Sequence, residues 1–365
     1  MLKDPRVQQL AKTLVNHSIK AQAGENIVIY AQVKAKPLVI ALFEELRAVK
    51  ANAFVQIEDD DFTREMYLSQ TEKSLEVKYR WLENQMKDID GFISIRSLES
   101  DYSNSDVSDQ VLAYRKHFQP LQKTRLAKKW VLLNWPTEGG AHKAKMSYSK
   151  YIDYMLDVMN VDYAKMGQDF EALDRLMQKT DKVRIVSPGT DLTFSIKNIN
   201  VVPCYGQNNI PDGEIYTAPV KDSVNGTITY NTPSPYRGLV FNNISLTFKD
   251  GKIIKCSSDQ SQEILESIFN TDDGARYVGE FAIGVNPKVT VPMTNTLYDE
   301  KIAGSIHFTP GMSYDSAPNG NDSAIHWDLV LIQTPEYGGG EIYFDDVLIR
   351  KDGLFVIDEL KPLNP

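Results

Sequence analysis

The stretch NIVIYAQVKAKPLVIALFEELRAVKANAFVQIE, residues 26–58, contains a pattern that is typical of one class of fold. Its first and last six residues are short apolar runs with the length and composition of buried β-strands. Between them, Leu38, Leu42 and Leu46 recur at helical spacing, and Pro37 suits the first turn of a helix. The stretch therefore predicts a strand, a helix and a second strand, which is the unit from which parallel sheets are built.

The same alternation continues through the first half of the chain. A predicted helix over residues 72–88 leads to the apolar run GFISIR (91–96), and another over about 106–127 leads to WVLLNW (130–135). Repeated strand–helix units predict a Rossmann-like α/β domain. None of these strands is followed by a glycine-rich nucleotide-binding motif, so a nucleotide-binding enzyme is the least favoured function.

The second half of the chain has a different character. A helical stretch over about 149–179 is expected to act as a connector. After it, segments such as GTDLTFSI and NGTITYN alternate in polarity and are joined by Asp-Gly and Asn-Gly turns, which favour hairpins and an antiparallel sheet. We therefore predict an α/β domain over residues 1–180, including the connector, and a β-rich α+β catalytic domain over residues 181–365.

The composition excludes several classes of protein. The 365 residues carry a formal net charge of −9, which argues against nucleic acid as a partner because phosphate contacts need clustered Lys and Arg. No apolar run approaches the ~20 residues of a membrane span, so no membrane association is expected. The two cysteines, Cys204 and Cys256, suggest no disulfide framework and favour a reducing, cytoplasmic location.

A histidine and an aspartate two residues apart interrupt the apolar run SAIHWDLVLI (323–332). If this run is a β-strand, His326 and Asp328 share one face and Trp327 points the other way. Residues so spaced lie about 6.6 Å apart along a strand, so that their side chains can reach two ions separated by about 3.5 to 4 Å. A hydrogen-bonded pair without any metal is the competing interpretation.

Other acids and a second histidine lie in apolar surroundings in the same half. Glu214 follows a Pro-Asp-Gly turn, Glu280 lies within YVGEFAIGVN, and LYDEKIAGSIHF contains Glu300 and His307. A buried carboxylate costs several kcal/mol unless it is paired or bound to a cation. Glu, Asp and His without Cys suit zinc, cobalt or manganese. Alternatively, Glu280 lies at a strand end and Glu214 faces water.

Five segments together resemble a known family. DKVRIVSPGTDLTFSI, PDGEIYTAPVKDSVNGTITYN, DDGARYVGEFAIGVN, LYDEK followed by GSIH, and NDSAIHWDLV occur in this order and cover most of residues 180–335. They resemble the signature segments of the thermophilic-type metallo-aminopeptidases (the aminopeptidase T, AmpS and PepS family, M29). The resemblance implies a cytosolic exopeptidase that forms homodimers and acts on peptides with a free N-terminus.

The resemblance also implies a set of site residues. The expected ligands of two divalent ions are Glu214, Glu280, Glu300, His307, His326 and Asp328. Glu280 is expected to bridge both ions and to act as the general base for a water shared between them. Tyr314, seven residues after His307, matches the tyrosine that stabilises the transition state in the family.

Two departures from the family pattern keep other functions open. The segment after His307 reads FTPG, with Pro310 where the family has a helix-like segment, and the position of Glu300 is shifted. One alternative is a catalytically silent relative that binds metal and a peptide or partner. The other is a metallohydrolase that cleaves a different small amide.

Overall fold

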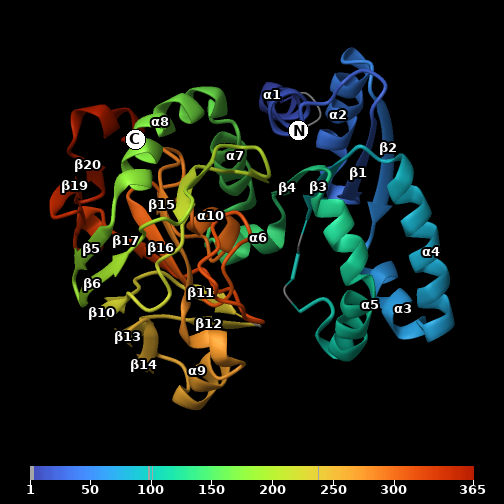
Figure 1. Cartoon of the computed structure of the whole chain (residues 1–365). Coiled ribbons are helices and arrows are strands. Elements are labelled where there is room, and N and C mark those ends of the chain that lie inside the picture. The colour runs from blue at the N-terminus through green and yellow to red at the C-terminus, as the bar shows by residue number, and fades with distance from the viewer. Residues whose placement is uncertain (1–3, 98, 101, 237) are drawn as a thin grey trace. The chain divides into compact units, whose positions relative to one another are not determined.

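The computed structural model describes residues 4–97, 99–100, 102–236 and 238–365, which form two units. The first unit contains the described residues up to Asn160 together with Gly206–Pro211, and the second contains Val161–Tyr205 and Asp212–Pro365. Figure 1 shows helices and a parallel sheet in the blue-to-teal part and mostly strands in the green-to-red part. The predicted fold class, an α/β unit followed by a β-rich unit, is confirmed.

The first unit is built on a five-stranded parallel sheet with the strand order β2-β1-β3-β4-β8. The helix predicted between the first two strands, α2 (Lys36–Ala48), buries Leu38, Leu42 and Leu46 completely, because the three side chains lie on one stripe of the helix. The strands are β1 (Asn26–Gln32), β2 (Asn52–Glu58), β3 (Gly91–Arg96), β4 (Lys129–Asn134) and β8 (Asn209–Ile210).

The helices of the first unit follow the predicted alternation. They are α1 (Pro5–Lys12), which continues as a π-helix over Thr13–Ser18, α2 (Lys36–Ala48), α3 (Asp60–Ser69), α4 (Glu72–Asp88), α5 (Ser108–Leu126), α6 (Glu138–Lys143) and α7 (Tyr148–Met159). The predicted helix over 72–88 is confirmed by α4.

The connector differs from the prediction. Instead of one helical stretch over 149–179, the chain forms α7 and then a separate helix, α8 (Tyr163–Lys179). The break has a local cause, since Asp162 leaves helical geometry and its side chain accepts a hydrogen bond from the backbone N–H of Lys165 at 3.0 Å. The predicted boundary at residue 180 coincides with the end of α8, whereas the second unit already begins at Val161.

The second unit contains two large antiparallel sheets. The first has eight strands in the order β14-β13-β10-β6-β5-β18-β19-β20, and the second has five in the order β17-β16-β15-β9-β7. The eight strands are β14 (Lys252–Ser257), β13 (Ser245–Lys249), β10 (Asn225–Thr229), β6 (Thr190–Ser195), β5 (Lys182–Ser187), β18 (Glu341–Phe344), β19 (Val347–Lys351) and β20 (Leu354–Phe355). The five are β17 (Val330–Ile332), β16 (Ser305–Pro310), β15 (Val278–Gly284), β9 (Glu214–Thr217) and β7 (Val202–Cys204).

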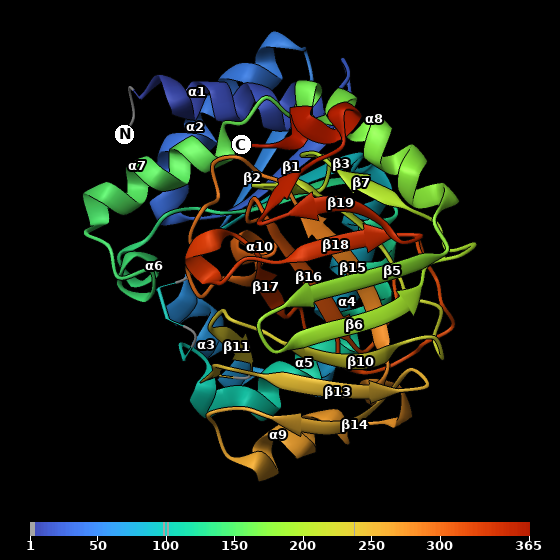
Figure 2. The same ribbon diagram turned by 90° about the vertical axis from the view of Figure 1, so that its left-hand side faces the viewer.

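The two sheets pack against each other through aromatic rings. The ring of Phe194 on β6 lies 5.0 Å from the rings of both Phe281 on β15 and Phe308 on β16, measured between centroids. Figure 2 shows β15, β16 and β17 behind the eight-stranded sheet. Because side chains alternate along a strand, the neighbours of Phe281 and Phe308 point to the opposite face of the five-stranded sheet. That face carries the polar residues described below.

Among the described residues, no helix combines the length and the apolar character that crossing a membrane requires.

Candidate metal centre

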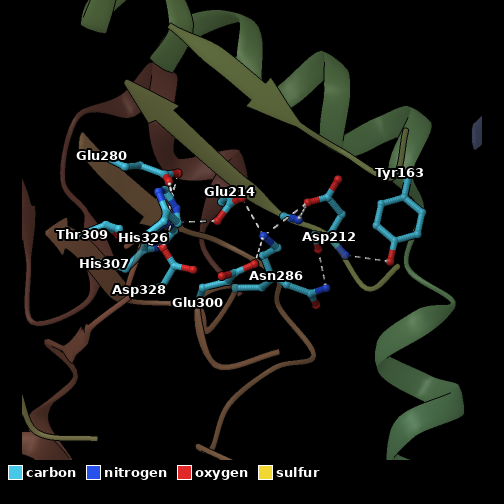
Figure 3. A network of polar contacts seen from close by, with 12 residues as sticks. Tyr163, Asp212, Glu214, Glu280, Asn286, Glu300, His307, Thr309, His326 and Asp328 are labelled. Atoms are coloured by element: carbon cyan, nitrogen blue, oxygen red, sulfur yellow. Dashed lines mark hydrogen bonds and ion pairs between the residues drawn. The ribbon is translucent and has the colours of Figure 1, made fainter. Parts of the chain in front are cut away.

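Five of the predicted ligands lie together on the outer face of the five-stranded sheet (Figure 3). Glu214 begins β9, Glu280 lies on the central strand β15, and His307 lies on β16. His326 and Asp328 come from the segment that precedes β17. The first three side chains are buried, and those of His326 and Asp328 are each 15% exposed.

The predicted strand over residues 323–332 is only partly confirmed. Regular pairing begins at Val330, and before it His326 forms a single bridge with Gly311. The expected facing of the side chains nevertheless holds, because His326 and Asp328 meet in the cluster while the Trp327 ring packs 4.6 Å from the ring of Tyr236. Side chains in the segment before Val330 therefore still alternate between two faces, although most of this segment is not hydrogen-bonded to a neighbouring strand.

The five side chains form two groups of three that share Glu280. Nε2 of His307 lies 3.3 Å from Oε1 of Glu280 and 3.5 Å from Oε2 of Glu214. Nε2 of His326 lies 3.1 Å from Oε2 of Glu280 and 3.1 Å from Oδ1 of Asp328. Within each group the donor atoms all lie within 4.8 Å of one another. Each oxygen of Glu280 thus faces a different group.

Hydrogen bonds hold the second group, which consists of Glu280, His326 and Asp328, in place. The Nδ1 of His326 lies 2.8 Å from the carbonyl oxygen of Met312, to which it donates, so that Nε2 is directed at the carboxylates. The hydroxyl of Thr309 donates to Oδ1 of Asp328 at 2.8 Å. Sequence analysis missed Thr309, although its place two residues after His307 on the same strand indicates the same face.

Glu300 belongs to neither group. Its Oε1 accepts a hydrogen bond from Nζ of Lys301 at 2.6 Å, and the same Nζ lies 2.6 Å from Oε1 of Glu214 and 3.9 Å from Oδ1 of Asp212. Lys301 and Asp212 were also missed. Their roles depend on the loop after α10 (Thr296–Asp299) folding back onto β9, which no spacing in the sequence reports.

The charges in the cluster stabilise one another. Burial lowers the pKa of His307, but the carboxylates of Glu214 and Glu280 raise it to about 9. Burial also lowers the pKa of His326, while Asp328 and Glu280 raise it to about 12. The pKa values of the carboxyls are shifted in the opposite direction. Burial raises the pKa of Glu280 and of Asp328, but the histidines lower it further and hold both values below the usual range. The result is a cluster of largely buried charges that stabilise one another.

The residues present fit divalent ions. Among the described residues, the buried Oε2 of Glu214 has no hydrogen-bond partner, and Nε2 of His326 makes no hydrogen bond of good geometry although two carboxylate oxygens lie 3.1 Å from it. Both atoms point at members of their own group, where an ion would be coordinated. The donors are carboxylate oxygens and imidazole nitrogens in threes, the set that catalytic zinc and related ions use while keeping a position open.

Tyr314 lies at the edge of the cluster. Its ring centroid is 4.6 Å from that of His326 and 5.7 Å from that of Tyr216, and the residue is 40% exposed. Partial burial and the nearby Glu280 raise the pKa of Tyr314 well above its usual value, so the hydroxyl keeps its proton. It is thus available as a hydrogen-bond donor.

Several known proteins are similar to this chain. Aminopeptidase PepS of Streptococcus thermophilus is 24% identical over 89% of this chain and 91% of its own length. Aminopeptidase AmpS of Bacillus subtilis is 24% identical over 85% of this chain and 84% of its own. The solved structure of wild-type AmpT from Thermus thermophilus covers 97% of this chain and 99% of its own with a TM-score of 0.81 at 17% identity, which shows a common fold.

The family model of the thermophilic metalloproteases (M29) matches residues 3–341, which confirms the resemblance found in the sequence. The chain belongs to the thermophilic metalloprotease family M29.

Proposed function

We propose that this protein is a metallo-aminopeptidase that releases N-terminal amino acids from peptides. Two divalent ions, zinc, cobalt or manganese, would be held by Glu214, Glu280 and His307 and by Glu280, His326 and Asp328. The observation that carries the proposal is that the two oxygens of Glu280 face two separate groups of ligands. Membership of a metalloprotease family and relatives named aminopeptidases support it.

The chemistry of the proposed reaction follows from the residues around Glu280. Divalent ions bound here would lower the pKa of a water and polarise the scissile carbonyl. Glu280 would stay unprotonated beside the positive charge of bound ions, which replaces that of the histidine protons, and so could accept a proton from the attacking water. The hydroxyl of Tyr314 donates a hydrogen bond to the oxygen that becomes negative as water adds. A free α-amine offers one more donor to the centre, which selects uncapped N-termini.

The proposal includes a cytoplasmic location and a homodimer. Both come from the family resemblance, and two unpaired cysteines suit a reducing compartment. Sedimentation equilibrium of the purified chain tests the assembly: a mass of two chains is expected, and a monomer at all concentrations would contradict it.

The test of the activity is hydrolysis of aminoacyl-p-nitroanilides with free or acetylated N-termini. Protein stripped with a chelator is compared before and after refilling with zinc, cobalt or manganese, beside a Glu280→Ala variant. Metal-dependent release from free N-termini, absent in the variant, is expected. Cleavage of the acetylated controls instead would indicate a different amide hydrolase. Ions bound without any turnover would indicate a silent relative.

A further inference from the structure

Lys301 is a fully buried lysine surrounded by acids. Its side chain is 0% exposed, and its Nζ lies 2.6 Å from oxygens of Glu214 and Glu300 and 3.9 Å from Oδ1 of Asp212. Lysine is almost never buried to this extent unless its charge is paired. None of the steps proposed for the reaction uses this residue, although one of its partners, Glu214, is a proposed ligand (Figure 3).

The ammonium lies beside a third group of potential ligands. Cys204, Asp212 and Glu214 each offer a donor atom, and these atoms lie within 4.8 Å of one another. Cys204 on β7 is paired directly with Glu214 on β9, so their side chains project from neighbouring strands to the same face. This group shares Glu214 with the proposed metal centre. It differs from the other two groups by containing a thiol and by having a lysine next to two of its members.

The two oxygens of Glu214 have different partners. Oε1 lies 2.6 Å from Nζ of Lys301, whereas Oε2 is buried without a hydrogen-bond partner among the described residues and faces His307 at 3.5 Å. A carboxylate held at one oxygen presents the other in a fixed direction. With Oε1 held by Lys301, Oε2 of Glu214 is presented to His307.

We propose that Lys301 is a positioning residue, a built-in cation that takes the place of an ion in the group Cys204, Asp212 and Glu214. It reserves Glu214 for one ion of the metal centre and keeps soft ions from binding Cys204. This inference rests on the proposed two-ion centre. Without the ammonium, the third group would present two carboxylates and a thiol to any cation that enters, a set that attracts cadmium and cobalt(II) through sulfur.

Cadmium and cobalt(II) loading of the full chain tests the inference. Stripped protein is equilibrated with each ion, ions per chain are counted by mass spectrometry, and thiolate-to-metal absorption is recorded. Wild type is expected to bind two ions without a thiolate band. Lys301→Met is expected to bind a third ion and to show the band, which disappears in Lys301→Met with Cys204→Ser. Lys351→Met, which removes an exposed lysine paired with Glu341, is the matched control and is expected to behave as wild type.

The outcomes separate the two proposals. Fewer than two ions on wild type would overturn the metal centre, whereas two ions on both wild type and a folded Lys301→Met chain would overturn the role of Lys301 alone. Lys301→Gln is a milder second variant, because its amide keeps a hydrogen-bond donor but no charge, and the same third ion is expected. A further measurement needs no change at Lys301: a thiolate–cadmium band on wild type that Cys204→Ser abolishes would contradict the inference.

Discussion

Two histidines and three carboxylates in the cluster stabilise one another's charges. The pKa of His307 is raised to about 9 and that of His326 to about 12, both above neutrality, so the two rings are protonated at pH 7. An imidazole must be neutral at the nitrogen that coordinates a metal. Loading the centre therefore displaces protons that the carboxylates have kept in place.

This predicts a pH dependence of metal binding. The protonated histidines compete with the ions below their raised pKa values, so affinity is expected to rise with pH, and loading at pH 7 is expected to release about two protons per chain. Calorimetry in buffers with different ionisation enthalpies measures the number of protons directly. His142→Ala, in α6 of the first unit, serves as a control with unchanged release. Proton release near zero in wild type would contradict this account of the site.

Tyr314 permits a second prediction about a single residue. Tyr314→Phe removes the hydroxyl and keeps the ring against His326. If the hydroxyl stabilises the developing oxyanion, kcat is expected to fall by about 10²- to 10³-fold while ions per chain remain unchanged. Tyr343→Phe, a tyrosine paired with Glu341 on β18, is the control. An unchanged kcat, or a loss of bound metal that accounts for the whole effect, would rule out the proposed role.

Among the elements, the end of β16 positions the proposed ligands His326 and Asp328. Gly311 follows this strand with φ +112° and bridges to His326, and a Cβ at Gly311 would lie 2.1 Å from the carbonyl oxygen of Ile325. Only glycine allows both the backbone conformation and the close approach. The FTPG segment, which departs from the family pattern, thus ends β16 and brings the His326 segment alongside.

We therefore expect Gly311→Ala to lower the stability of the chain by at least about 1–3 kcal/mol and to weaken binding of ions, because the His326 segment must move. Gly320→Ala is the matched control, since Gly320 also has a positive φ (+79°) but nothing lies within 4 Å of its added Cβ. Thermal unfolding and metal titration of both variants provide the comparison. Equal effects of the two substitutions would show that backbone strain, and not the contact with Ile325, is responsible.

The sequence predicts helices and strands well where a local repeat of apolar residues determines them. It predicts the structure less well where contacts between distant segments determine it. The helical spacing of leucines in α2 and the boundaries of α4 are both found as expected. The break at Asp162 was missed because the apolar pattern continues through it, whereas the Asp162 side chain caps a new helix by accepting a hydrogen bond from the chain. Lys301 could not be assigned to the site from local pattern, since its partner Glu214 lies far along the chain. For Thr309 a local signal existed, because it lies two residues after His307 on the same strand.

At the scale of the whole molecule, the proposed ligands all come from the second unit, between residues 214 and 328. Ions that bind only the folded state stabilise it by mass action, by about 2.7 kcal/mol at a free ion concentration 100 times the dissociation constant. The strands β15 and β16 carry Glu280 and His307, so bound ions are expected to stabilise them.

Hydrogen exchange of the stripped and refilled protein is expected to show this difference between the units. Amides of β15 and β16 should exchange more slowly after refilling, while those of β1 and β3 in the first unit should change little. A Glu280→Ala chain treated identically should show no added protection. Equal protection of both units by the ions would mean that the metals act elsewhere than in the proposed centre.

A centre in which two ions share Glu280 is proposed to cleave N-terminal residues from peptides. Stripped protein titrated with zinc or cobalt tests this, with ions per chain counted and hydrolysis of an aminoacyl-p-nitroanilide followed in the same samples. We expect activity that requires bound ions, reaches its maximum at two ions per chain and is absent from Glu280→Ala. No hydrolysis of the free N-terminal substrate at any loading, with two ions bound, would contradict the claim.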